Sequence, residues 1–257
     1  MRTIITHFYN EEYMLPWWLQ HHTRIFDHGI LINYGSTDNS VAICHELAPH
    51  WTVVDSFNSH FDALMVDFEV MHYERQISGW KIALNVSEFF GITDMAQFEE
   101  GINTSDHQAW RLPGAFMVDV EPHNAPDPGI SLMSQKHHGF LERDFDFATT
   151  PLKWYWKQMR SRIYHQASIG AYFVGRHQTQ LPHVGEIIHG VYILWYGYAP
   201  WTESYIERKL SFQSRIPQAD RKARWGSQHM IGREALQQRY QTLLAQTTDL
   251  RHLSIFK

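Results

Sequence analysis

The sequence predicts an α/β fold in which a mixed, mostly parallel sheet is flanked by helices. Runs of β-branched and apolar residues alternate with segments of helical periodicity over residues 3–86. With 257 residues, 44% of them hydrophobic, the chain can bury a sizeable core, and it contains no internal repeat or long linker. We therefore expect one domain over 1–257, made of a half at 1–95 and a half at 96–257.

The alternation can be followed element by element. A strand is predicted at 3–8 (TIITHF), which ends where Asn10 breaks the apolar run. A helix follows, because Pro16 is tolerated in a first turn and Leu15 and Leu19 recur at helical spacing. The other elements of this pattern are expected as strands at 29–33, 51–57 and 80–86 and helices at 39–48 and 60–77.

The second half is less regular. Strands are predicted at 116–120 and 171–174, and a helix at 200–213. The longest apolar stretch, 191–201, is interrupted by Gly197 and is shorter than a membrane-spanning helix requires, so we expect no transmembrane segment.

Charge is distributed unevenly along the chain. The net charge of -5 argues against nucleic-acid binding, but residues 1–149 sum to -14 and residues 150–257 to +9. Two interpretations remain open: the two parts attract each other, or the basic part faces an anionic ligand such as a diphosphate.

Several compartments and site types are disfavoured. The single cysteine, Cys44, excludes an internal disulfide and a zinc site of several thiolates. Acidic Glu11 and Glu12 interrupt the N-terminal segment before a signal-type apolar region is complete, so we expect a cytoplasmic protein. The sequence has no GxxxxGK[ST], GxGxxG, GxSxG or HExxH motif.

Polar residues follow each of the four predicted parallel strands. Ligands of such sheets bind beyond the carboxyl ends of the strands, so these residues are expected to converge on a site. They are Asn10, Glu11, Glu12, Asn33, Asp38, Asp55, Asn85 and Glu88.

Histidine and tryptophan are abundant, with 18 and 10 residues. The set His177, His183 and His189 leaves a metal role open, although most histidines are expected to be core or surface residues. The tryptophans are expected mainly in the core, with stacking against sugar rings as the alternative.

Three segments carry a resemblance to a known family. They are THFYNEEYMLPWWLQHHTRIFDHGILINYGSTDNS at 6–40, GWKIALNVSEFF at 79–90 and WYGYAPWTESYIERK at 195–209. They resemble the family 2 glycosyltransferases of the GT-A fold, in particular the short bacterial branch. The resemblance implies that 1–95 is a nucleotide-binding half, and we expect 96–257 to face the acceptor and the diphosphate. It implies nucleotide-binding roles for Asn10, Glu11, Glu12, Asn33, Asp38 and Asn85.

The sequence departs from this family where a metal ion is expected. An Asp-x-Asp that holds Mn²⁺ or Mg²⁺ on the donor diphosphate is replaced by Asn85-Val86-Ser87, and only Glu88 keeps a charge. Hard cations prefer carboxylate ligands. We therefore expect either no metal or weak binding through Glu88, with His189 or His177 supplying a nitrogen.

The basic C-terminal part offers other partners for a diphosphate. Arg208 and Lys209 are the first candidates, because guanidinium and ammonium groups bind phosphate oxygens. The further candidates are Arg215, Arg221, Lys222 and Arg224. An ordinary charged surface is the alternative interpretation.

These expectations describe a hexosyltransferase-like glycosyltransferase. It would move a sugar from a nucleotide-diphosphate sugar, with UDP as the favoured nucleotide, to a hydroxyl of a saccharide or lipid-linked acceptor, and peripheral membrane contact is compatible with the sequence. Inversion requires a general base, for which Asp119, Glu121 and Glu186 are candidates. The alternatives are a non-catalytic sugar- or nucleotide-binding protein with the same fold, and a hydrolase with a histidine-bound metal.

Overall fold

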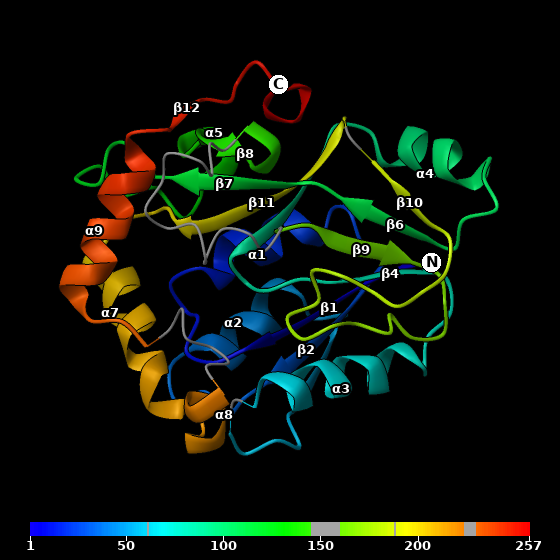
Figure 1. Cartoon of the computed structure of the whole chain (residues 1–257), viewed down its shortest axis with the longest axis horizontal. Helices are drawn as coiled ribbons and strands as arrows, with labels where there is room; N and C mark the ends of the chain where they lie inside the picture. Colours follow the sequence, from blue (N-terminus) through cyan, green and yellow to red (C-terminus); the bar gives the residue numbers. More distant parts are fainter. Residues whose placement is uncertain (61, 145–159, 188, 224–229) are drawn as a thin grey trace.

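The computed structural model of the chain describes residues 1–60, 62–144, 160–187, 189–223 and 230–257 (Figure 1). Two sheets lie side by side with helices around them, which confirms the expected α/β fold class. Among the described residues, no helix is both long and apolar enough to cross a membrane.

The first sheet has seven strands in the order β10-β6-β9-β4-β1-β2-β3. Its four parallel strands are β1 (Arg2–Phe8), β2 (His28–Asn33), β3 (Thr52–Asp55) and β4 (Trp80–Ala83). The other three are β6 (Ala109–Leu112), β9 (Arg162–His165) and β10 (Val184–Glu186). Strand β9 runs antiparallel to both β4 and β6, so the sheet is mixed but mostly parallel, as expected.

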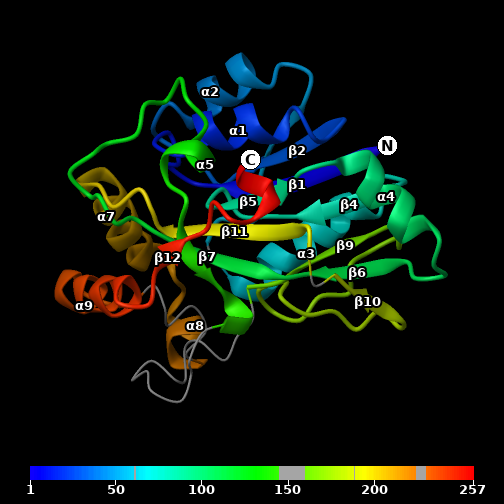
Figure 2. The same cartoon turned by 90° about the horizontal axis from the view of Figure 1, so that it is seen from above.

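Both faces of this sheet are covered, because its strands are apolar on both sides. Ile4 packs in the core that includes α1 (Leu15–His22) and α2 (Ser40–Leu47). The next residue, Ile5, packs in a separate core with α3 (Ala63–Glu74). Figure 2 shows the resulting layers, with α1 and α2 on one side of the strands and α3 on the other.

The second sheet has the strand order β12-β8-β7-β11-β5. These strands are β5 (Glu88–Ile92), β7 (Gly114–Val118), β8 (His138–Leu141), β11 (Val191–Tyr198) and β12 (Thr248–Asp249). Residues of β7 and β11 pack against α7 (Glu203–Ser211) and α9 (Arg233–Leu244) in a core of their own. The remaining short elements are α4 (Met95–Asn103), α5 (Leu132–Gln135), η1 (Glu142–Asp144), η2 (Phe212–Arg215), α8 (Gln218–Ala223) and η4 (Ser254–Phe256).

Two sequence expectations need correction. Residues 171–174 form no strand; only Tyr172 makes a single bridge, to Thr179, because Ala171 has a left-handed φ of 45° that interrupts extended backbone. The strand expected at 80–86 ends at Ala83, and the chain then crosses to the second sheet, where β5 pairs antiparallel with β11. The helix expected at 200–213 is present as α7 followed by η2.

Candidate functional site

A cavity of about 530 Å³ lies at the carboxyl ends of β1, β2 and β3. This is the edge at which parallel sheets place their ligands. Its lining residues are Tyr9, Asn33, Tyr34, Gly35, Asp55, Ser56, Asn58, Ser59 and Arg215. Three aromatic or guanidinium side chains and several hydrogen-bonding groups therefore surround one space.

The walls of this cavity are fixed by polar contacts. The Arg215 guanidinium carbon lies 3.8 Å from the centroid of the Tyr9 ring, and its Nη1 donates to the Tyr34 carbonyl at 2.9 Å. Asn33 donates from Nδ2 to Asp55 Oδ1 at 2.9 Å. Burial raises the pKa of Tyr34 to about 12, so its phenol is protonated at neutral pH. The cavity thus combines aromatic surface with a carboxylate acceptor.

Behind the cavity, the loops that follow β1 and β2 are bound to each other. Asn10, with a left-handed φ of 50°, accepts the Thr37 backbone N–H on its side-chain oxygen at 2.8 Å. Glu12 accepts from Asn39, and its own backbone N–H donates to Asp38 Oδ2 at 3.1 Å. Asp38 also accepts the backbone N–H of Ser40 at 3.0 Å. The structure therefore brings these three predicted residues together as the framework of one loop pair.

Of the two predicted cations of α7, Arg208 reaches the same loops and Lys209 contacts β11. Arg208 donates from Nε to the Asn10 carbonyl at 3.0 Å and forms an ion pair with Glu11. Lys209 donates to the Gly197 carbonyl at 3.0 Å and lies 4.8 Å from the centroid of the Tyr198 ring. Burial, followed by nearby arginines, lowers the pKa of Lys209 to about 7.

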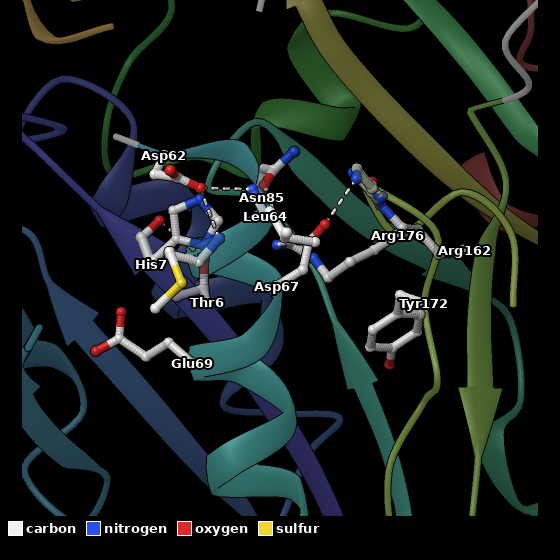
Figure 3. Close-up of polar contacts among 12 residues, drawn as sticks. Thr6, His7, Asp62, Leu64, Asp67, Glu69, Asn85, Arg162, Tyr172 and Arg176 are labelled. Atoms are coloured by element: carbon white, nitrogen blue, oxygen red, sulfur yellow. Dashed lines mark hydrogen bonds and ion pairs between the residues drawn. The ribbon is translucent and has the colours of Figure 1, made fainter. Parts of the chain in front are cut away.

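Two buried ion pairs lie beside the segment that joins β4 to β5. Arg162 donates from Nε and Nη2 to the two carboxylate oxygens of Glu88, at 2.8 and 2.5 Å, and both side chains are 1% exposed. Arg176 forms an ion pair with Asp67 of α3 and donates from Nη2 to Asn85 Oδ1 at 2.9 Å. Figure 3 shows Arg162 and Arg176 on neighbouring segments with Asp67 and Asn85 beside them.

The surroundings of His7 on β1 disfavour the positively charged form of its ring. Its pKa lies well below the ordinary value, first because the ring is buried and then because Arg176, Arg162 and Arg208 all repel its charged form. Burial first, and then the charges of Arg162, Arg160 and Arg176, lower the pKa of His177. The charges of Arg162, Arg176 and Arg208 therefore all disfavour the charged form of His7. We call these three residues the arginine cluster.

Of the three predicted general bases, Asp119 and Glu121 lie together, since the Glu121 backbone N–H donates to Asp119 Oδ1 at 3.0 Å, whereas Glu186 lies apart. Asp119 is 1% exposed, and its carboxylate accepts from Lys136 Nζ at 2.7 Å and from the Trp201 backbone N–H at 2.9 Å. Glu121 is exposed nearby. Glu186 is exposed on β10, at the far edge of the first sheet, 3.5 Å from Arg111. The structure therefore does not gather these carboxylates at the cavity.

The structure also separates Glu88 from His189. In the antiparallel pairing of β5 with β11, Glu88 lies opposite Trp195, whereas Val191 lies opposite Ile92 at the other end of β5. Four residues of strand correspond to about 13 Å, and exposed His189 lies beyond that end.

Among the described residues, one group of three side chains that could bind a metal ion lies elsewhere. His137, His138 and Asp249 have ligand atoms within 4.8 Å of one another on β8 and β12. Arg251 already donates to both Asp249 oxygens. This group contains none of the histidines that the sequence singled out.

Arg162 and Arg176 are the site residues that sequence reasoning missed. Their partners lie 74 and 109 residues away in the chain, so no local spacing identifies them. The available signal was the positive charge of residues 150–257, which contain both arginines.

Comparisons with known proteins give distant matches only. No family model and no curated protein matches the sequence. Among solved structures, the chain aligns with S. aureus TarS 1-349 in complex with UDP-GlcNAc at 12% identity and a TM-score of 0.41, over 83% of this chain and 66% of that one. It aligns with the mannosyltransferase PcManGT from Pyrobaculum calidifontis, in complex with GDP-Man and Mn²⁺, at 12% identity and 0.41, over 86% and 63%.

A third match is glucosyl-3-phosphoglycerate synthase from Mycobacterium tuberculosis in complex with Mn²⁺, UDP and glucosyl-3-phosphoglycerate, at 14% identity and a TM-score of 0.31, over 47% of this chain and 45% of that one. This chain spans less than two thirds of the length of each of these three structures. The similarities are too distant to assign an activity, which therefore has to be argued from the site itself.

Proposed function

We propose that the protein is a glycosyltransferase that uses a nucleotide-diphosphate sugar. The observation that carries this proposal is the adjacency of two environments that such a donor needs. One is the cavity at the ends of β1, β2 and β3, lined by Tyr9, Tyr34 and Asp55. The other is the arginine cluster, whose member Arg208 donates from Nε to the carbonyl of Asn10, the residue after cavity residue Tyr9.

In this proposal the nucleoside occupies the cavity. Its base packs against the aromatic wall, and Asp55 accepts an N–H of the base, which suits the imide of uracil. The paired loops that contain Asn10, Glu12 and Asp38 hold the shape of the cavity, and Asn33 orients Asp55.

The diphosphate then points toward the basic side of the site. Arg208 and Lys209 are partly exposed. Their N–H groups can donate charge-assisted hydrogen bonds to phosphate oxygens. When the acceptor hydroxyl attacks the anomeric carbon, negative charge develops on the departing diphosphate, and fixed cations stabilise that charge.

The acceptor hydroxyl also needs a general base. Two of the three candidates, Glu121 and Glu186, are exposed, whereas the carboxylate of Asp119 is held by Lys136. Glu186 lies on β10, at the edge of the first sheet opposite β3. We assign the proton-accepting role to Glu121 and a positioning role to Asp119, which fixes the backbone at Trp201. Inversion at the anomeric carbon is part of the proposal.

The buried state of Asp119 also favours a second candidate function. A protein with the donor pocket but without a competent base would bind nucleotide sugars and transfer nothing. Release of UDP from UDP-sugars in the presence of saccharide acceptors distinguishes the enzyme from such a binding protein.

Nucleotide binding is the first test. Isothermal titration with UDP, GDP and uridine should show binding, with UDP tighter than uridine because of its phosphates. Asp55→Ala should weaken uridine and UDP about equally, by roughly tenfold for a lost hydrogen bond to a charged group. Glu46→Ala, on the exposed face of α2, is the control. Equal UDP affinity in Asp55→Ala and the wild type would remove Asp55 from the nucleoside site.

Lys209 provides a pH-dependent test of the same proposal. Its pKa of about 7 in the free protein should rise when a diphosphate binds, because the anion favours the charged amine. UDP binding should then take up a proton, and UDP affinity should fall as the pH rises from about 7 to 9. Calorimetry in buffers of different ionisation enthalpy measures this uptake. Lys209→Met should abolish it; unchanged uptake would exclude Lys209 as its source.

A further inference from the structure

The residues that follow β4 do not fit the divalent cation that the family resemblance implies. A cation there needs free oxygen ligands, but Asn85 Oδ1 accepts from Arg176 and both Glu88 oxygens accept from Arg162. Glu88 is also fully buried. Binding a metal would require displacement of two guanidinium groups and would leave both arginines without these partners.

Cationic groups already occupy this position, and each is paired with a carboxylate. Arg176 is 3% exposed, and its Nε has no hydrogen-bond partner among the described residues, although Nη1 and Nη2 are engaged by Asp67 and Asn85. An orphan guanidinium donor in a buried position indicates unused capacity for an anion. Arg162 lies beside Arg176, because its Nη1 donates to the carbonyl of Gly175, the residue before Arg176. Burial first, and also the charge of Arg176, lower the pKa of Arg162.

The third member of the arginine cluster connects this position to the cavity. Arg208 holds the carbonyl of Asn10, next to cavity residue Tyr9, and its charge also acts on buried His7. Charges in such a low-dielectric region are screened much less than charges at the surface. The arginine cluster thus consists of three guanidinium groups, each paired with one carboxylate, and Arg208 is the member next to the cavity.

We propose that the arginine cluster replaces the divalent cation, so that a nucleoside diphosphate binds here without metal. This inference rests on the proposed function and specifies how the donor site is neutralised. Arg208 would contact the phosphate oxygens, whereas buried Arg176 and Arg162 would contribute charge and hold the Asn85 to Glu88 turn in place.

The ion pairs of the cluster allow a charge effect to be separated from a structural one. Arg176→Gln and Asp67→Asn break the same pair, but the first removes a cation and the second an anion. Arg208→Gln and Glu11→Gln form a second set with the same logic. A purely structural role predicts weaker UDP binding in all four variants, whereas a charge role predicts opposite signs within each pair.

The experiment is calorimetric titration of UDP and uridine into the wild type and the four variants, each in EDTA and in millimolar Mn²⁺, with thermal melts to show that every variant is folded. We expect equal wild-type UDP affinity with and without Mn²⁺. Arg176→Gln and Arg208→Gln should bind UDP about tenfold more weakly, with uridine binding unchanged. Asp67→Asn and Glu11→Gln should bind UDP as tightly as the wild type or more tightly.

Two results would overturn the inference: a gain of tenfold or more in wild-type UDP affinity on adding Mn²⁺, or parallel losses in both members of each variant pair. Failure of UDP, GDP and uridine alike to bind the wild type would contradict the proposed function itself, and the inference with it. These failures are distinguishable, because the first two require that UDP binds.

Discussion

Glu88→Ala is expected to lower the free energy of unfolding by about 3–5 kcal/mol, because it leaves the charge of Arg162 buried without a counter-ion. Arg162 is 1% exposed and depends on both Glu88 oxygens. Glu88 also accepts the backbone N–H of Asn85 at 2.8 Å, so the turn after β4 loses a bond as well. Urea denaturation at neutral pH measures the change.

Three further proteins test whether the loss of stability comes from the unpaired charge of Arg162. Glu88→Gln keeps an oxygen acceptor and should lose less stability than Glu88→Ala, whereas combining Glu88→Met with Arg162→Met should recover most of the loss, because neither charge is then buried alone. Glu203→Ala breaks the exposed pair with Arg233 and should cause no measurable change. Wild-type stability in Glu88→Ala, together with weaker Mn²⁺ binding, would instead identify Glu88 as a metal ligand.

Glu142→Gln is expected to stabilise the protein at alkaline pH. Burial raises the pKa of Glu142 from 4.5 to about 7, and one of its oxygens, Oε1, has no hydrogen-bond partner among the described residues. The folded state therefore holds this proton more tightly than the unfolded state does. The free energy of unfolding should fall as the pH rises from about 4.5 to 7, by up to about 3 kcal/mol from this group.

The measurement compares urea denaturation of the wild type and the variant near pH 5 and near pH 8. The variant should gain stability relative to the wild type at the higher pH and much less at the lower one. Its amide oxygen can still accept the Arg160 backbone N–H, which Glu142 accepts at 2.9 Å. Glu234→Gln, on the exposed face of α9, is the control. An equal pH dependence in wild type and Glu142→Gln would show that Glu142 ionises normally.

Local patterns were enough to predict the first sheet up to β4. Each of those strands is a short apolar run, and each neighbouring helix has its own periodicity, so alternation implied parallel pairing. The second sheet could not be predicted in this way, because β5 pairs with β11, about a hundred residues later. The apolar run at 191–201 was visible in the sequence, but its partners were not.

The candidate site shows the same division. Residues at strand ends, such as Asn33 and Asp55, could be predicted because the carboxyl ends of parallel strands share an edge. Arg162 and Arg176 could not, since they come from later segments whose placement depends on tertiary packing. The opposite net charges of residues 1–149 and 150–257 did indicate that the two parts would form ion pairs, without identifying the partners. Glu11, Asp67 and Glu88 in the acidic part each pair with an arginine of the basic part.

The insertion of β11 between β5 and β7 has a consequence for synthesis on the ribosome. Until residues 191–198 have emerged, β5 lacks β11, its one strand partner among the described residues, and Phe89 lacks the ring contact with Tyr196. Such an open strand edge is a template for association with other chains. Because Arg208 follows β11, the nascent chain is expected to acquire affinity for a diphosphate only after this risk has passed, so that the ligand stabilises chains whose second sheet has already formed.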